Sequence, residues 1–572
     1  MDKNQAGMAD KEVNCIWHRP TGGILDRHKS DWRGSGEHGV ENGVNRWTGQ
    51  KLRLLAKTLP SKNSRKRALG AKIGDFAHVR TKTYQTFSFA QTCILLLPNL
   101  KKRLLRAQGV ALAGSMKLTP LRIRNRMILV PLALLLSGCI NPLGRDTTGP
   151  EPRPPRSKPQ PSRNFAWGIS TASYQYEDPA VKPGDADYFS TDWDILISQH
   201  GAPEKGNALY SWTHFDKDIA ALKKIGVTHY RFSIEWARIE PRKGEFNEEA
   251  IRRYVGMARR LKEAGIEPVV CLWHFTFPAW LYDKKNPKAS NWLHPEARSR
   301  WLSYLDKVLP ALAPHVNYFA PQNEPNGQIT TAYIAAQWPP MMALAFGTYW
   351  KAIDASTGMF RDAAVRIKKI KPTAKVLAIE ALPWWEGSPL DPGGIFYTTM
   401  IHGNIDHLDR VYDVCDILGI NYYYSQHASP ASLIAEAWRR GHNYSMMGWY
   451  IDPNGLYKEI CRVGNRYGKP MMVTENGIAT RNDAKRVSYI RDHLAAIGHA
   501  IRDGYDVRGY FSWSLADNYE WHYGYKALFG LAKMNPETYE RELKPSAYFY
   551  RDTIRANAKV SALEAIKPTP AK

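Results

Sequence analysis

The chain has 572 residues, of which 44% are hydrophobic and 12% aromatic, and this is enough to bury a large core. Its net charge of +25 is concentrated at the front of the chain. Residues 1–115 contain 21 Lys and Arg against 8 Asp and Glu, and residues 116–163 contain 9 against 2, which leaves +5 for the rest. The part of the chain after residue 163 is therefore not expected to bind nucleic acid.

Six cysteines are scattered along the chain without the CxxC spacing of a zinc site. We expect buried thiols, and neither a disulfide framework nor a metal centre. No organic cofactor is indicated either. The cysteines are Cys15, Cys93, Cys139, Cys271, Cys415 and Cys461.

Residues 1–115 show no sustained hydrophobic periodicity and end in a basic run at 101–106. This composition predicts either a disordered basic extension or a segment that precedes the true start of translation. The second interpretation is favoured by the segment that follows, which requires a free N-terminus.

Residues 116–139 have the organisation of a secretory signal. A positive stretch is followed by ten apolar residues at 127–136, which are too few to span a bilayer comfortably. The sequence Leu-Ser-Gly-Cys at 136–139 resembles the lipobox of bacterial lipoproteins, which implies lipidation of Cys139 and anchoring to the bacterial envelope. A buried hydrophobic helix is the alternative. Residues 140–163 contain seven prolines and are expected to form a semi-rigid linker.

From residue 164 to residue 572, strand-like runs alternate with helical patterns. One helix is clear: Asn247 is a suitable N-cap, residues 251–261 carry an apolar stripe, and Gly265 ends it. Eight such units predict an α/β fold, a (β/α)8 TIM barrel with its active site at the C-terminal ends of the strands. The expected strands are 165–170, 228–234, 267–274, 317–323, 375–380, 416–423, 470–474 and 507–515.

Two of these strands are followed by a glutamate in a short motif, Pro-Gln-Asn-Glu-Pro at 321–325 and Val-Thr-Glu-Asn-Gly at 473–477. A carboxylate at the end of a buried strand is costly to ionise unless partners stabilise it. Two of them predict a pair that divides the roles of acid and nucleophile, as glycoside hydrolysis requires. Alternatively, Glu324 and Glu475 could each cap a helix or pair with a buried arginine.

The barrel segment resembles glycoside hydrolase family 1, the β-glucosidase family, over residues 165 to about 550. The resemblance implies a retaining β-glycosidase that acts on a carbohydrate substrate by double displacement. Six motifs carry it, in the family's order: FAWG…ASYQ at 165–175, YRFSIEWARIEP at 230–241, NEP at 323–325, NYY at 421–423, TENG at 474–477 and WSLADNYEW at 513–521.

By this resemblance, Glu475 is the nucleophile and Glu324 the general acid/base. Arg231 and Tyr423 would keep the nucleophile ionised and hydrogen-bonded. The residues that the resemblance assigns to substrate binding are Gln175, His274, Asn323, Asn421, Trp513, Glu520 and Trp521.

The chain also departs from the family. The usual His-Trp-Asp-Leu-Pro reads His-Phe-Thr-Phe-Pro at 274–278, which changes the wall beside the sugar. Glu520 would repel a 6-phosphate, so unphosphorylated glycosides are expected as substrates. The alternatives are an endo-acting cellulase-like enzyme, a transglycosidase that uses the same two glutamates, and an inactive sugar-binding module. The sequence does not indicate an oligomeric state.

Overall fold

The computed structural model describes residues 165–556, apart from residues 180, 183, 186, 390, 392–393 and 430–440. The extension, the signal with its lipobox and the linker expected from the sequence lie outside these residues. In the described part of the chain, eight parallel strands form a closed barrel in the order β1-β10-β9-β7-β5-β4-β3-β2. These strands are β1 (Ala166–Ser170), β2 (His229–Ser233), β3 (Glu267–Cys271), β4 (Tyr318–Ala320), β5 (Lys375–Ala381), β7 (Ile417–Asn421), β9 (Met471–Asn476) and β10 (Val507–Trp513).

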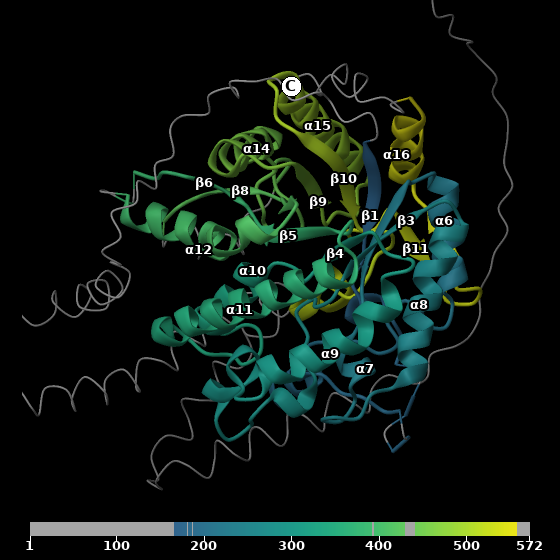
Figure 1. Ribbon diagram of the computed structural model, residues 1–572. Helices are drawn as coiled ribbons and strands as arrows, with labels where there is room; N and C mark the ends of the chain where they lie inside the picture. Colours follow the sequence, from purple (N-terminus) through teal and green to yellow (C-terminus); the bar gives the residue numbers. More distant parts are fainter. Residues whose placement is uncertain are drawn as a thin grey trace, which may run out of the picture. The chain divides into compact units, whose positions relative to one another are not determined.

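All eight strands predicted from the sequence are therefore present, and the (β/α)8 barrel is confirmed. Helices surround the strands (Figure 1). The helices are α4 (Ser173–Tyr176), α5 (Asp192–His200), α6 (Phe215–Ile225), α7 (Trp236–Ile239), α8 (Glu248–Glu263), α9 (Ala297–Leu312), α10 (Pro325–Tyr333), α11 (Phe346–Ile370), α12 (Ile395–Val411), α14 (Pro453–Tyr467), α15 (Asp483–Arg502) and α16 (Pro545–Ala556). Short 3-10 turns include η7 (Trp521–Lys526).

Helix α8 begins as its sequence predicts. The Asn247 side chain accepts a hydrogen bond from the backbone N–H of Ala250 at 2.9 Å. Glu248 and Glu249 occupy the first turn, where the positive end of the helix dipole stabilises them. Gly265 follows the helix with φ of +75°, a conformation that glycine adopts without strain.

Two hydrophobic layers hold the barrel together. Outside it, the apolar faces of the helices pack against the strands in one continuous core. Inside it, alternate residues of the strands fill the lumen, so the barrel is packed and not a channel. The buried residues of this inner layer are Ala166, Val269, Cys271, Ala320, Leu377, Ile379, Ile417, Met472 and Phe511. The thiols of Cys271, Cys415 and Cys461 are free and buried, as expected.

Six of the eight strands are shorter than the sequence predicts, and the C-terminal ends of β3 and β4 differ most. β3 ends at Cys271 and not at residue 274, and β4 ends at Ala320 and not at residue 323. In both cases the backbone leaves the ladder before a residue in the left-handed region, Phe275 with φ of +71° and Glu324 with φ of +45°. The chain turns at these points to bring side chains over the mouth of the barrel.

Two small sheets, β6 (Trp384–Glu386) with β8 (Ser425–His427) and β11 (Ala532–Met534) with β12 (Arg541–Leu543), were not predicted from the sequence. Among the residues that the structure describes, no helix is both long enough and apolar enough to cross a bilayer.

Candidate active site

Glu475 lies near the end of β9 and is held by two donors from other strands. Arg231 of β2 donates to Glu475 Oε1 at 2.5 Å, and the hydroxyl of Tyr423, just after β7, donates to Oε2 at 2.6 Å. Arg231 is fully buried and Glu475 is 4% exposed. A buried carboxylate with a direct ion pair and a second donor is stabilised in its charged form. The structure thus places two of the predicted residues, Arg231 and Tyr423, on the carboxylate of a third, Glu475.

The glycine of the same motif is required by its surroundings. A Cβ atom on Gly477 would lie 2.0 Å from the backbone oxygen of Trp513, the last residue of β10. No side chain fits there, so Gly477 lets the chain after Glu475 pass directly beside Trp513.

Glu324 follows β4 by four residues and precedes the first residue of α10. It adopts the left-handed region, and its backbone N–H donates to Ile379 O of β5 at 2.9 Å. Its carboxylate accepts a hydrogen bond from Asn421 Nδ2 at 2.8 Å. Among the residues that the structure describes, no cationic side chain forms an ion pair with Glu324, whereas Arg231 does so with Glu475.

The two carboxyls therefore differ in acidity. Burial raises the pKa of Glu324 well above its usual range, and the negative charge of Glu475 raises it further. Burial also raises the pKa of Glu475, but Arg231 and the Tyr423 hydroxyl oppose that rise. Glu475 is consequently the first of the pair to ionise, and Glu324 retains the proton.

A ladder of amides connects the two glutamates. Arg231 donates to Asn323 Oδ1, and Asn421 Nδ2 donates to the same oxygen at 3.1 Å. The Thr474 hydroxyl donates to Asn421 Oδ1 at 2.7 Å, which fixes the orientation of that amide. Asn323 Nδ2 faces His274 Nε2 at 3.1 Å. Both predicted asparagines therefore lie between the carboxyls.

Gln175 and Glu520 contact each other in a second group of polar residues. Gln175 Nε2 donates to the Tyr519 backbone oxygen at 2.8 Å, to Asn518 Oδ1 at 3.1 Å and to Glu520 Oε2 at 3.3 Å. Burial, followed by the negative charge of Glu475, raises the pKa of Glu520 to about 8. Gln175 Oε1 and His274 Nδ1 are buried without a hydrogen-bond partner in the described part of the chain. Such unpaired polar atoms are costly unless a ligand uses them.

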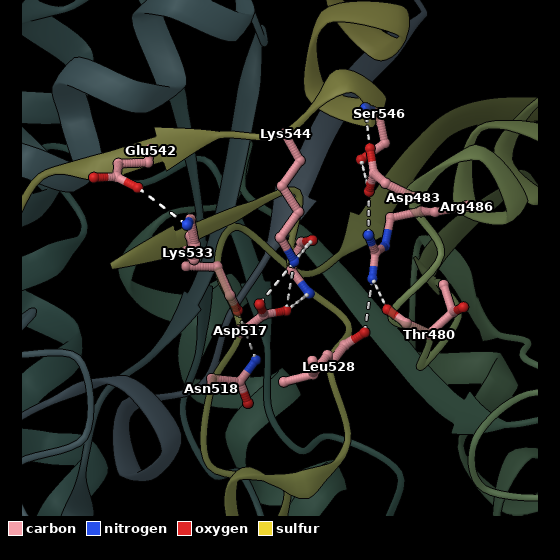
Figure 2. A network of polar contacts seen from close by, with 12 residues as sticks. Thr480, Asp483, Arg486, Asp517, Asn518, Leu528, Lys533, Glu542, Lys544 and Ser546 are labelled. Atoms are coloured by element: carbon pink, nitrogen blue, oxygen red, sulfur yellow. Dashed lines mark hydrogen bonds and ion pairs between the residues drawn. The ribbon is translucent and has the colours of Figure 1, made fainter. Parts of the chain in front are cut away.

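The segment after β10 that carries Glu520 is held in place by an ion pair between Asp517 and Lys544. Lys544 donates to both carboxylate oxygens of Asp517, at 2.8 and 2.7 Å, and to Gly530 O at 2.9 Å (Figure 2). Nearby, Arg486 pairs with Asp483. Because Asp517 adjoins Asn518, this network also supports the amide that orients Gln175.

An aromatic wall closes the site. Trp521, with φ of +47°, stacks on Tyr174 with the rings 5.8 Å apart and within 4° of parallel. The ring centroid of Phe275, a position expected to alter the wall beside the sugar, lies 5.2 Å from that of Trp521 and 4.7 Å from that of Trp338. Trp513 lies 6.1 Å from the ring of His274. The predicted Trp513, Trp521 and His274 are thus in one wall, whereas Trp338 was not predicted because no motif marks it.

Thr276, a second position at which the motif at 274–278 differs from the family's, is buried. Its hydroxyl donates to the buried carboxylate of Glu235 at 3.0 Å. Burial raises the pKa of Glu235 to about 7. Sequence reasoning also missed Thr474 and Asn518, which orient Asn421 and Gln175; both lie inside the recognised motifs. Within the described ranges, no three His, Cys, Asp or Glu side chains gather closely enough to hold a metal ion.

A closed parallel barrel carries two carboxyls of different acidity near the C-terminal ends of its strands, Glu475 buried and Glu324 half-buried. This arrangement fits the pair of carboxyls that glycoside cleavage requires. The comparisons with known proteins agree. Glycosyl hydrolase family 1 matches residues 158–381 and 400–559. The chain is 28% identical to beta-glucosidase A of Acetivibrio thermocellus over 69% of this chain and 98% of that protein. It is 27% identical to a beta-galactosidase of Sulfolobus acidocaldarius over 71% of this chain and 98% of that protein.

Among solved structures, a beta-glycosidase from Pyrococcus horikoshii superimposes with a TM-score of 0.62 at 28% identity, over 72% of this chain and 99% of that one. The chain belongs to glycosyl hydrolase family 1. It is an O-glycosyl hydrolase of the retaining β-glycosidase kind.

Proposed function

We propose that Glu475 and Glu324 carry out a double displacement on unphosphorylated β-glycosides. The observation that carries this assignment is the unequal support of the two carboxyls. Arg231 and Tyr423 both donate hydrogen bonds to Glu475, whereas the donor to the Glu324 carboxyl in the described part of the chain is the neutral amide of Asn421. The supported carboxylate is suited to be the nucleophile, and the one that keeps its proton is suited to be the acid.

In the first step, a Glu475 oxygen forms a bond to the anomeric carbon as the glycosidic C–O bond breaks, and Glu324 gives its proton to the departing oxygen. The negative charge of Glu475 is lost in the ester, so Glu324 becomes a stronger acid and its carboxylate can act as a base. In the second step, water attacks the anomeric carbon, Glu324 takes the water's proton, and the Glu475 carboxylate is released.

The binding residues follow from the same geometry. Asn323 and Asn421 lie beside the carboxyls and are assigned to hydroxyls near the reacting carbon. Gln175, His274 and Glu520 offer unpaired or ionisable polar atoms for the other hydroxyls. Trp513 and Trp521 provide flat apolar faces for the sugar ring.

A panel of 4-nitrophenyl β-glycosides tests the substrate class. The glucoside, galactoside or fucoside is expected to be hydrolysed, and the 6-phosphoglucoside to react at least about 100-fold more slowly, about 2.7 kcal/mol in the barrier. The reason is that the Glu520 carboxyl offers no positive charge to a phosphate. Equal rates on phosphorylated and unphosphorylated glucosides would contradict the role of Glu520. Activity on long glucans alone, without any on aryl monoglycosides, would favour the endo-acting alternative.

We also propose that Cys139 carries lipid and tethers the barrel to the bacterial envelope. The support is the sequence alone, a charged stretch, a short apolar stretch and a lipobox-like ending, followed by a proline-rich tether. We expect the mature protein to begin at Cys139 and to fractionate with membranes. Cys139→Ser should release the protein or leave its precursor unprocessed, without changing catalysis. Intact mass spectrometry that finds unmodified Cys139 with the preceding residues still attached would exclude the proposal.

A further inference from the structure

A buried acid–base pair lies behind the strand that supports Glu324. Glu380 belongs to β5, where Leu377 and Ile379 face the barrel lumen, so its side chain faces the helices outside. Glu380 Oε1 lies 2.6 Å from Nδ1 of His407 on α12, and both residues are fully buried. Glu380 Oε2 has no hydrogen-bond partner in the described residues. The roles proposed above use neither residue.

Hydrogen bonds through Ser356 of α11 connect this pair to the motif that contains Glu324. The Ser356 hydroxyl lies 3.3 Å from His407 Nε2 and donates to Gln322 Oε1 at 2.9 Å. Gln322 Nε2 donates to the Ser356 backbone oxygen at 3.1 Å, which fixes the orientation of the amide. Four buried side chains, those of Glu380, His407, Ser356 and Gln322, therefore form one chain.

The protons of this chain can be counted. Ser356 has a single hydroxyl proton, which it gives to Gln322, so it accepts one from His407 Nε2–H. The 2.6 Å contact between His407 Nδ1 and Glu380 requires one more proton between them. The pair as a whole thus carries no net charge, and its polar atoms depend on one another. Removing one member would leave the others buried without partners.

This series of hydrogen-bonded side chains ends at Gln322, two residues before Glu324, where the backbone is strained. Glu324 has φ of +45°, a left-handed conformation that is unfavourable for a residue with a Cβ atom, so the surroundings must impose it. On one side, β5 binds the segment through Ile379 O and through the Asn326 side chain, which contacts the backbone of Ala381 at 2.9 and 3.1 Å. On the other side, Gln322 is bound by Ser356.

We infer that the Glu380–His407–Ser356–Gln322 chain is a positioning device for the acid/base Glu324, which it holds in its left-handed conformation. This inference rests on the proposed roles of Glu324 and Glu475. The elements involved, β5, α10, α11 and α12, gather on one flank of the barrel (Figure 1). Glu475 is held from β2 and from the segment after β7, so the chain does not reach the nucleophile. The two glutamates should therefore respond differently when the chain is broken.

The test uses Ser356→Ala, which removes the central hydroxyl, and Glu380→Gln, which keeps the side-chain volume. For each variant, kcat/KM is measured with a β-glucoside whose leaving group needs protonation (phenyl) and with one that does not (2,4-dinitrophenyl). We expect the phenyl glucoside to lose between about tenfold and 100-fold, because a misplaced acid is costly, and the dinitrophenyl glucoside to lose less than about threefold. Thermal unfolding of each variant is recorded in parallel.

Two controls make the outcomes distinct. Asp354→Asn breaks a different contact between α11 and α12, the exposed pair with Arg410, and should change neither rate. Glu324→Gln should show the selective loss on the phenyl glucoside in its largest form. Suppose that Glu324→Gln shows this selective loss. If Ser356→Ala and Glu380→Gln then lose equal kcat/KM on both substrates, or lose none, the positioning role is wrong while the proposed function stands. If Glu324→Gln itself shows no selectivity, both are overturned.

Discussion

Glu475→Ala is expected to lower turnover by at least about 1000-fold, because the variant cannot form the covalent intermediate. Added azide should restore part of the rate, since the small anion fits the space of the missing carboxylate. It attacks the face of the sugar that Glu475 occupied, so the product is the α-glycosyl azide. The measurement is turnover of an activated aryl β-glucoside, with the product identified by NMR.

The same variant leaves Arg231 buried without its anionic partner, and removing one member of a buried ion pair typically costs about 3–5 kcal/mol. Stability must therefore be measured beside activity. Glu475→Gln is the matched control, because it keeps the side-chain volume and an acceptor oxygen for Arg231. A folded Glu475→Ala variant that retained more than about a tenth of the wild-type rate, about 1.4 kcal/mol in the barrier, would remove Glu475 from the role of nucleophile.

Glu324→Gln should slow substrates according to their leaving groups. Glycosides with poor leaving groups are expected to lose between about 100-fold and 10,000-fold, because no proton reaches the departing oxygen. Activated glycosides should still glycosylate Glu475 and then stall, since no base activates the water. Burst kinetics would show this accumulation. Equal slowing of good and poor leaving groups would show that Glu324 is not the general acid.

The pH dependence provides a second readout of the same variant. Glu324 must be protonated for the first step. The value of kcat/KM is therefore at its full level below the pKa of Glu324 and falls as the pH rises through that pKa. Burial and the charge of Glu475 raise this pKa, which places the loss above the usual range of a carboxyl. Glu475 must be ionised, so activity is also lost as the pH falls through its pKa. Glu324→Gln should abolish the high-pH loss on activated substrates and keep the low-pH loss.

The fold was largely predictable because each barrel strand is a short apolar run followed by room for a helix. The largest errors fall at 272–274 and 321–323, which were assigned to strands, and smaller ones at 422–423 and 514–515. Side-chain types there do not reveal that Phe275 and Glu324 take positive φ values, since these are imposed by tertiary contacts. The two-stranded sheets were missed because runs of three residues carry no detectable alternation.

The candidate site was predictable for a different reason. Parallel strands of a barrel end at one rim, so residues in or just after their C-terminal halves converge although they are far apart in sequence, such as Arg231 and Glu475. Ser356 and His407 could not be found in this way. They lie within helices, and their contact with Glu380 depends on how α11 and α12 pack against β5.

The central claim, that Glu475 and Glu324 act by double displacement, is tested most directly by proton NMR of the sugar as it is first released. Two successive inversions retain configuration, so we predict that the β-anomer appears first and that the α-anomer follows only by mutarotation. First appearance of the α-anomer would show a single displacement, with water activated by one glutamate, and would contradict a covalent intermediate on Glu475.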